Sequence, residues 1–197
     1  LLLAISSCFL TGCVNQHPKD SKKSSQGESV ETMLEITDPK EKQAVLNAKA
    51  KVKALSGNPR IVATSPAVAD ICDKLDLDLV GVPKSSVSKI PSRYKKVKKV
   101  GLAMSPDMEI VSSLNPDWIL APSSLETDLK PKFEELKNTE YAFLNLRSVQ
   151  GMYRSVQKLG EIFGKQQEAE KMTKEFTTFY KSYTKRNKIK NIPKFSY

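Results

Sequence analysis

Short, almost continuously apolar runs alternate with amphipathic segments through the middle of the chain. The apolar runs are 60–64 (RIVAT), 79–82 (LVGV), 118–120 (WIL) and 141–144 (YAFL). Such runs are typical of strands that are buried on both faces, as in parallel sheets covered by helices. The segments between them carry apolar residues at helical spacing. The pattern therefore predicts an α/β fold with a Rossmann-like parallel sheet of four or five strands.

The stretch 97–121 is the part of this pattern that bears most on function. A short strand is expected to end at Gly101, and a helix is expected to open at Ser105-Pro106. Serine is a good N-cap, and proline suits the first helical position. Met104 is therefore predicted to follow the carboxyl end of a strand, which is the edge at which open α/β sheets bind ligands.

Two helices are predicted after the last strand, and one before the first. Apolar residues recur at helical spacing from Val149 to Phe163, where Gly164 can end the helix. The same spacing over 165–192 predicts a long second helix that is rich in lysine. A shorter helix with a narrow apolar stripe is expected over 38–56, either docked on the domain or only marginally stable.

The first residues have the composition of a secretion signal. Residues 1–13 (LLLAISSCFLTGC) are apolar, end in small residues and are too short to span a bilayer. The motif LTGC matches the bacterial lipobox, in which the cysteine is lipidated and the chain is cut just before it, so Cys13 is the expected lipidation site. The alternatives are an uncleaved membrane segment or a buried strand. Residues 14–57 are expected to form a polar tether that ends in the short helix.

The charge of the chain narrows the classes of partner. Its 197 residues include 32 Lys and Arg against 22 Asp and Glu, which gives a formal net charge of +10. This excess indicates an anionic surface or ligand, such as lipid headgroups, cell-wall polymers or carboxylates. The lysines are scattered, and no recognition-helix, zinc-finger or RNA-binding aromatic signature is present, so nucleic acid is not an expected partner.

Motifs for catalysis and for metal binding are missing from the sequence. The only histidine is His17, and the three cysteines (Cys8, Cys13 and Cys72) form no CxxC pair, so neither a metal site nor a disulfide framework is expected. There is no G-x-S-x-G, H-E-x-x-H or P-loop motif. We therefore do not expect an enzyme, and we expect Cys72 to be a small core side chain.

Polar loops and one methionine are expected at the carboxyl edge of the predicted sheet. They comprise Thr64, Ser65, Ala67 and Val68 after the first strand, Ser85, Ser86 and Val87 after the second, and Met104 after the third. Hydroxyls and helix N-termini suit a carboxylate or phosphate, whereas a thioether suits a soft metal or haem iron. Two simpler interpretations stay open: Met104 as a gap-filling core side chain, and Ser65 as only a helix cap.

Five segments of the chain carry a family resemblance. They are RIVATSPAVA, CDKLDLDLVGVP, IPSRYKKV, VGLAMSPDMEIVSSLNPDWIL and SVQGMYRSVQKLGEIF. Through them, residues 59–172 resemble the N-terminal lobe of the two-lobed bacterial binding proteins for siderophores, cobalamin and haem, with the haem-binding lipoproteins as the nearest likeness. The resemblance implies an α/β lobe over 58–164, a long inter-lobe helix over 165–192 and a truncated end at 193–197. The family's second lobe is expected to be absent.

The resemblance also implies roles for particular residues. In the haem-binding members, the methionine of a G-x-x-M-x-P segment supplies one axial ligand to haem iron, and here that methionine is Met104. The loops at 64–68 and 85–87 resemble those that line the haem groove, with helix N-termini near the propionates. Glu109 matches a glutamate that docks the lobe onto the permease. The alternative is that Glu109 only stabilises its helix dipole.

The function implied by the resemblance is the capture of haem, as transported ligand, by the substrate-binding lipoprotein of an ABC importer. The expected partners are the ABC permease and its ATPase, upstream cell-wall haem-transfer proteins, and the outer face of the cytoplasmic membrane in a Gram-positive type of cell. The alternatives are a siderophore or cobalamin carrier of the same family, and a tethered wall-interaction protein without a small ligand. A thioether favours haem over an oxygen-chelated ferric siderophore.

Overall fold

The structure, a computed structural model, describes residue 34 and residues 36–187. The predicted signal segment with Cys13, the first part of the predicted tether (14–33) and the predicted end at 193–197 lie outside the described residues. Within the described part of the chain, no helix combines the length and the apolar character needed to cross a membrane.

A five-stranded, wholly parallel sheet forms the centre of the fold, in the order β3-β2-β1-β6-β7. These strands are β1 (Ile61–Ala63), β2 (Leu79–Val82), β3 (Lys98–Lys99), β6 (Trp118–Pro122) and β7 (Glu140–Leu144). The predicted parallel α/β fold is therefore confirmed. The chain proceeds from β1 outward to β3 and then returns to the other side of β1 for β6. This reversal places a topological switch point between β1 and β6, where open α/β sheets bind ligands.

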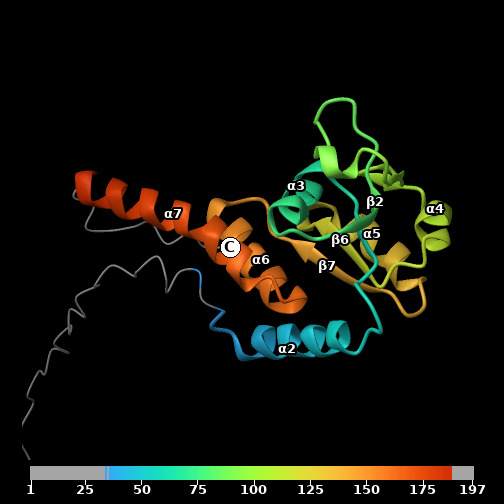
Figure 1. The fold of residues 1–197 in the computed structure, drawn as a ribbon, viewed down its shortest axis with the longest axis horizontal. Coiled ribbons are helices and arrows are strands. Elements are labelled where there is room, and N and C mark those ends of the chain that lie inside the picture. Colours follow the sequence, from blue (N-terminus) through green and yellow to red (C-terminus); the bar gives the residue numbers. More distant parts are fainter. Residues whose placement is uncertain (1–33, 35, 188–197) are drawn as a thin grey trace, which may run out of the picture.

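Helices cover both faces of the sheet, and each face has its own buried cluster (Figure 1). The first cluster joins the sheet to α3 (Pro66–Lys74) and α6 (Val149–Phe163), and the second joins it to α4 (Met108–Ser113) and α5 (Glu126–Glu134). The side chains of β1 alternate between the two, because successive residues of a strand point to opposite faces. Ile61 and Ala63 belong to the first cluster, and Val62 belongs to the second.

Cys72 lies in the first cluster as a fully buried side chain. Burial raises the pKa of its thiol to about 12, since a thiolate is poorly solvated there. The thiol therefore stays protonated at physiological pH, and the prediction of a core side chain is confirmed.

Two helices lie outside this layered lobe, and α6 contacts both. Helix α2 (Pro39–Lys53) packs along α6, with Val45 buried in the first cluster and the carboxylate of Glu41 paired with Lys158. The docked alternative for this helix is thus the correct one. Helix α7 (Gln166–Asn187) follows Gly164, whose φ of 70° ends α6 in the left-handed conformation, and extends away from the sheet (Figure 1). The predicted long helix is observed as far as the described residues go.

The chain forms a β-hairpin at Ser105-Pro106, where the sequence predicted a helix, so this prediction was wrong. β4 (Gly101–Leu102) pairs antiparallel with β5 (Ser105–Pro106). Helix α4 begins only after them, and its N-cap is Asp107, whose carboxylate accepts a hydrogen bond from the N–H of Ile110 at 3.0 Å. Serine and aspartate cap helices about equally well, so the sequence offers two caps, and the pairing across the hairpin decides between them.

Candidate functional site

Met104 lies in the turn of the β4–β5 hairpin, and the residue is 75% exposed. Leu102, on the first strand of the same hairpin, is 59% exposed. A gap-filling methionine would be enclosed by core side chains, so this exposure contradicts the core interpretation of Met104. The hairpin instead presents a thioether and an aliphatic side chain to the solvent, where a ligand can meet them.

Backbone hydrogen bonds fix this hairpin to the carboxyl end of β2. The N–H of Val100 donates to Val82 O at 2.9 Å, and that of Lys84 donates to Gly101 O at 2.7 Å. The N–H of Asp107 donates to Val100 O at 2.7 Å and so closes the base of the hairpin. Gly101 has a φ of 96°, and a Cβ at this position would lie 2.8 Å from the nitrogen of Asp107. Only glycine suits such a position. The hairpin therefore holds Met104 beside the loop that follows β2.

The loop after β1 is mostly buried, and the side-chain oxygens of Thr64 and Ser65 already have partners. The hydroxyl of Thr64 donates to Leu120 O at 3.4 Å, and the hydroxyl of Ser65 accepts the N–H of Val68 at 3.3 Å. Ser65 thus acts as the N-cap of α3, as the simpler interpretation proposed. Val68 is buried, and Ala67 is the exposed member of the group. Most side chains of this loop are therefore buried beneath the carboxyl edge of the sheet, whereas Ala67, at the N-terminus of α3, is exposed.

The loop after β2 is more accessible. Ser85 is half-buried and its hydroxyl accepts the N–H of Ser88 at 3.0 Å, whereas Ser86 is exposed. Val87 is 95% exposed. Lys84, the residue before Ser85, is hydrogen-bonded to the hairpin. The loop that carries Val87 is therefore next to the hairpin that carries Leu102 and Met104. Exposed apolar groups beside an exposed serine suit a ligand that is largely apolar and carries polar ends.

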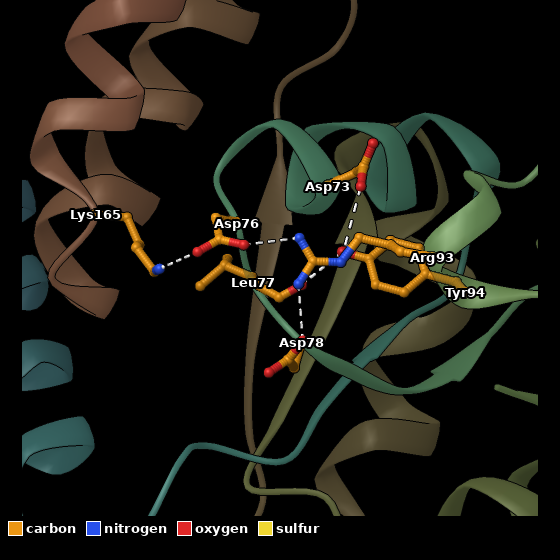
Figure 2. Close-up of polar contacts among 7 residues, drawn as sticks. All are labelled: Asp73, Asp76, Leu77, Asp78, Arg93, Tyr94 and Lys165. Atoms are coloured by element: carbon orange, nitrogen blue, oxygen red, sulfur yellow. Dashed lines mark hydrogen bonds and ion pairs between the residues drawn. The ribbon is translucent and has the colours of Figure 1, made fainter.

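The chain between the loop after β2 and the β4–β5 hairpin is held by Arg93 and Tyr94 of the short helix η1 (Ser92–Tyr94), as Figure 2 shows. Tyr94 is 2% exposed, and its hydroxyl donates to Leu77 O at 2.5 Å. The guanidinium of Arg93 pairs with the carboxylates of Asp73 at 3.8 Å, Asp76 at 2.9 Å and Asp78 at 2.8 Å. We call these contacts the η1 clamp. It fastens to the lobe the segment that lies between Val87 and Met104 in the sequence.

Asp76 takes part in a second ion pair. Its other carboxylate oxygen accepts a hydrogen bond from Lys165 Nζ at 2.9 Å (Figure 2). Lys165 and Arg93 together lower the pKa of the Asp76 carboxyl below its ordinary value, because both favour the ionised form. Asp76 is thus a carboxylate shared by two cations from distant parts of the chain.

Glu109 lies in the first turn of α4 and is exposed, as predicted. It is therefore accessible to a partner. Among the residues that the structure describes, no three His, Cys, Asp or Glu side chains gather to hold a metal ion.

Some residues of this edge were missed by the sequence analysis. Leu102 was passed over because the strand was expected to end before it. Ser123 and Ser124 follow β6 and so lie at the switch point, where the N–H of Thr64 donates to Leu120 O at 3.0 Å. The signal for these serines was present, since the polar pair directly follows a buried strand.

Residues 61–194, which are more than half of the chain, match the model of a family described as periplasmic binding protein. The chain belongs to the periplasmic binding protein family. The description of the family is that of binding proteins.

Individual known proteins resemble the chain over part of their length. The high-affinity heme uptake system protein IsdE of Staphylococcus aureus is 36% identical over 117 residues, which are 59% of this chain and 39% of IsdE. The crystal structure of S. aureus IsdE complexed with heme has a TM-score of 0.57 and 34% identity, and covers 70% of this chain and 52% of that chain. The crystal structure of an ABC transporter substrate-binding protein from Listeria monocytogenes has a TM-score of 0.63 and 41% identity, and covers 68% of this chain and 52% of that chain.

A siderophore-binding protein is also similar. BauB, bound to a complex of acinetobactin and ferric iron, has a TM-score of 0.53 and 25% identity, and covers 61% of this chain and 45% of that chain. The chain therefore spans 39% of the curated relative and about half of these solved structures. This partial coverage fits an N-terminal lobe, as the sequence predicted.

Proposed function

We propose that this chain binds haem as the N-terminal lobe of a substrate-binding lipoprotein that serves an ABC importer. The observation that carries the proposal is the exposed thioether of Met104, held by a glycine-dependent hairpin at the ligand-binding edge of a parallel sheet. A methionine sulfur is an established axial ligand of haem iron. The likeness to IsdE, whose structure was solved with heme, supports the same ligand class.

The neighbouring side chains suit the rest of a haem molecule, which is a flat apolar disc with two carboxylates. Leu102 and Val87 can cover apolar area beside Met104, and such burial is worth about 25 cal/mol per Å². The N-terminus of α3 at Ala67 and the hydroxyl of Ser86 can receive a carboxylate, since helix N-termini and hydroxyls favour anions. The loops are supported by residues that are buried or half-buried in the lobe: Thr64, Ser65, Val68 and Ser85.

A siderophore carrier of the same family is the second candidate, because BauB shares the fold at 25% identity. Titrating the purified chain with hemin and, in parallel, with ferric acinetobactin separates the two. The proposal expects a saturable Soret shift with hemin and no response to the ferric siderophore. Binding of the siderophore alone would favour the second candidate. Binding of neither would favour a tethered protein that contacts the cell wall.

Glu109 is proposed to dock the lobe on the permease of the importer, which works with its ATPase. The change Glu109→Ala is expected to leave haem binding intact and to weaken capture of the chain by the solubilised permease. The matched control is Glu126→Ala, which removes an exposed acidic side chain from the first turn of α5. Each change alone costs about 0.3–1 kcal/mol through the helix dipole. Equal capture of both variants would contradict docking through Glu109.

The membrane location is proposed from the predicted order of segments in the sequence. A signal segment (1–13) and a tether (14–57) precede the lobe (58–164), and an inter-lobe helix (165–192) follows it. We propose a lipid anchor on Cys13 at the outer face of the cytoplasmic membrane, where cell-wall haem-transfer proteins would deliver haem. Two acyl chains are needed for stable anchoring.

Cys13→Ala, expressed behind a full signal peptide, is therefore expected to lose incorporation of a fatty-acid probe and to leave the membrane fraction. Cys8→Ala is the matched control, since it removes the other cysteine of the same segment and should be labelled like the wild type. Labelling of Cys13→Ala at the wild-type level would rule out Cys13 as the lipidation site.

A further inference from the structure

In the sequence, helix η1 lies between the two most exposed parts of the candidate site. Val87 is on one side of it in the sequence and Met104 is on the other. The segment from Lys84 to Tyr94 is fixed at both ends. Lys84, at its N-terminal end, is hydrogen-bonded to the hairpin, and Tyr94, at its C-terminal end, is fixed in the core. After η1 the chain runs through β3 directly into the hairpin. The position of η1 therefore affects both loops that present apolar side chains.

Asp76, the acidic residue that links this clamp to another part of the lobe, has an unusual backbone. Its φ is 51°, in the left-handed region where glycine and asparagine are the common residues. The turn between α3 and β2 thus contains a charged side chain at a position where an uncharged residue would fit at least as well. Both carboxylate oxygens of that side chain are used, one by Arg93 and one by Lys165, each at 2.9 Å.

Lys165 connects the same carboxylate to the start of α7. Its N–H donates to Gly160 O at 2.7 Å, directly after the left-handed Gly164, so its backbone is fixed by the turn between α6 and α7. At this turn the two helices are in close contact, because a Cβ on Gly160 would lie 2.6 Å from that of Ala169. A shift of Lys165 therefore accompanies any change in the direction of α7.

We propose that Asp76 and Arg93 are positioning residues of the candidate site, and that through Lys165 they couple its loops to the start of α7. Where it concerns the ligand, this inference rests on the proposed function. A ligand that contacts Val87 and Met104 holds both ends of the segment around η1, and the shared carboxylate then holds Lys165. By linkage, a fixed start of α7 favours the ligand-binding arrangement of the loops to the same extent.

The test is hydrogen–deuterium exchange on the full chain, with and without hemin. Without hemin, Asp76→Asn is expected to raise exchange about three- to fivefold both at 92–99 and at 165–173, as expected when weak surface ion pairs are lost. Asparagine tolerates the left-handed backbone, and Asp76→Gly provides a second variant that fits it. The control Asp70→Asn breaks the exposed Asp70–Lys74 pair within α3, the helix that precedes Asp76, and should change neither segment.

Lys165→Met separates coupling from local stability. Hemin is expected to slow exchange at 92–99 in both the wild type and this variant, and to slow exchange at 165–173 only in the wild type. Protection of 165–173 that persists in Lys165→Met would overturn the coupling, as would an effect of Asp76→Asn confined to its own turn. If the wild type binds no hemin, the proposed function fails, and the comparison of the hemin-free proteins still decides whether Asp76 links the two segments.

Discussion

Replacing Met104 with leucine is expected to remove the methionine-ligated spectrum of ferrous haem bound to this chain. Leucine keeps the size and apolar character of the side chain and removes only the sulfur. Substitutions of groups that merely support a metal ligand cost about 10–100-fold in affinity, so loss of the ligand itself should raise the Kd for hemin at least about tenfold. The measurement is a hemin titration followed by reduction, with visible spectra recorded in both oxidation states.

The chain offers a matched control for this experiment. Met108 lies four residues further on, half-buried against the second cluster at the start of α4. Met108→Leu removes a thioether from the same neighbourhood without touching the hairpin, so its spectrum should equal that of the wild type. An unchanged spectrum for Met104→Leu would show that the sulfur of Met104 is not an axial ligand.

Gly101→Ala is expected to be among the most destabilising single changes in the hairpin region. The left-handed backbone costs about 1–2 kcal/mol for a residue with a side chain, and crowding against Asp107 adds about 1–3 kcal/mol. The free energy of unfolding in urea should therefore fall by about 2–5 kcal/mol. Because the hairpin holds Met104, haem affinity should fall as well.

Two other glycines separate these contributions. Gly164 has a φ of 70° and open space around its missing Cβ, so Gly164→Ala should show the conformational cost alone, about 1–2 kcal/mol. Gly57 has open space and no such backbone constraint, so Gly57→Ala should leave stability nearly unchanged. Equal urea midpoints for Gly101→Ala and Gly57→Ala would contradict the role given to the hairpin turn.

The parts of the fold that could be predicted are those with a strong hydrophobic pattern. β1, β2 and β6 are short apolar runs, and α6 has a continuous apolar stripe, so each was found close to its observed position. The short strand that was expected to end at Gly101 is observed as β3, but it ends two residues earlier, at Lys99. Its two residues are both exposed lysines and it pairs with β2 only through the backbone, so no hydrophobic pattern marks where it ends.

The candidate site was predictable only in part, for a related reason. The sequence identified Met104 and the loops around it, but not which of their side chains reach the solvent. The exposure of Leu102 and the burial of Val68 depend on how the hairpin and α3 pack. The ion pairs of Asp76 join residues that no local pattern connects, such as Asp76 and Lys165, which are 89 positions apart.

The short, lysine-only edge strand also affects how this protein behaves in a crowded solution. β3 ends the sheet on the side where the hairpin exposes Leu102 and Met104. A longer, apolar edge at that place would invite a second copy to add its own strand, with the exposed side chains strengthening the contact. Lys98 and Lys99 oppose this by charge repulsion and by leaving only two residues to pair. The lobe can thus leave these apolar side chains exposed while resisting self-association.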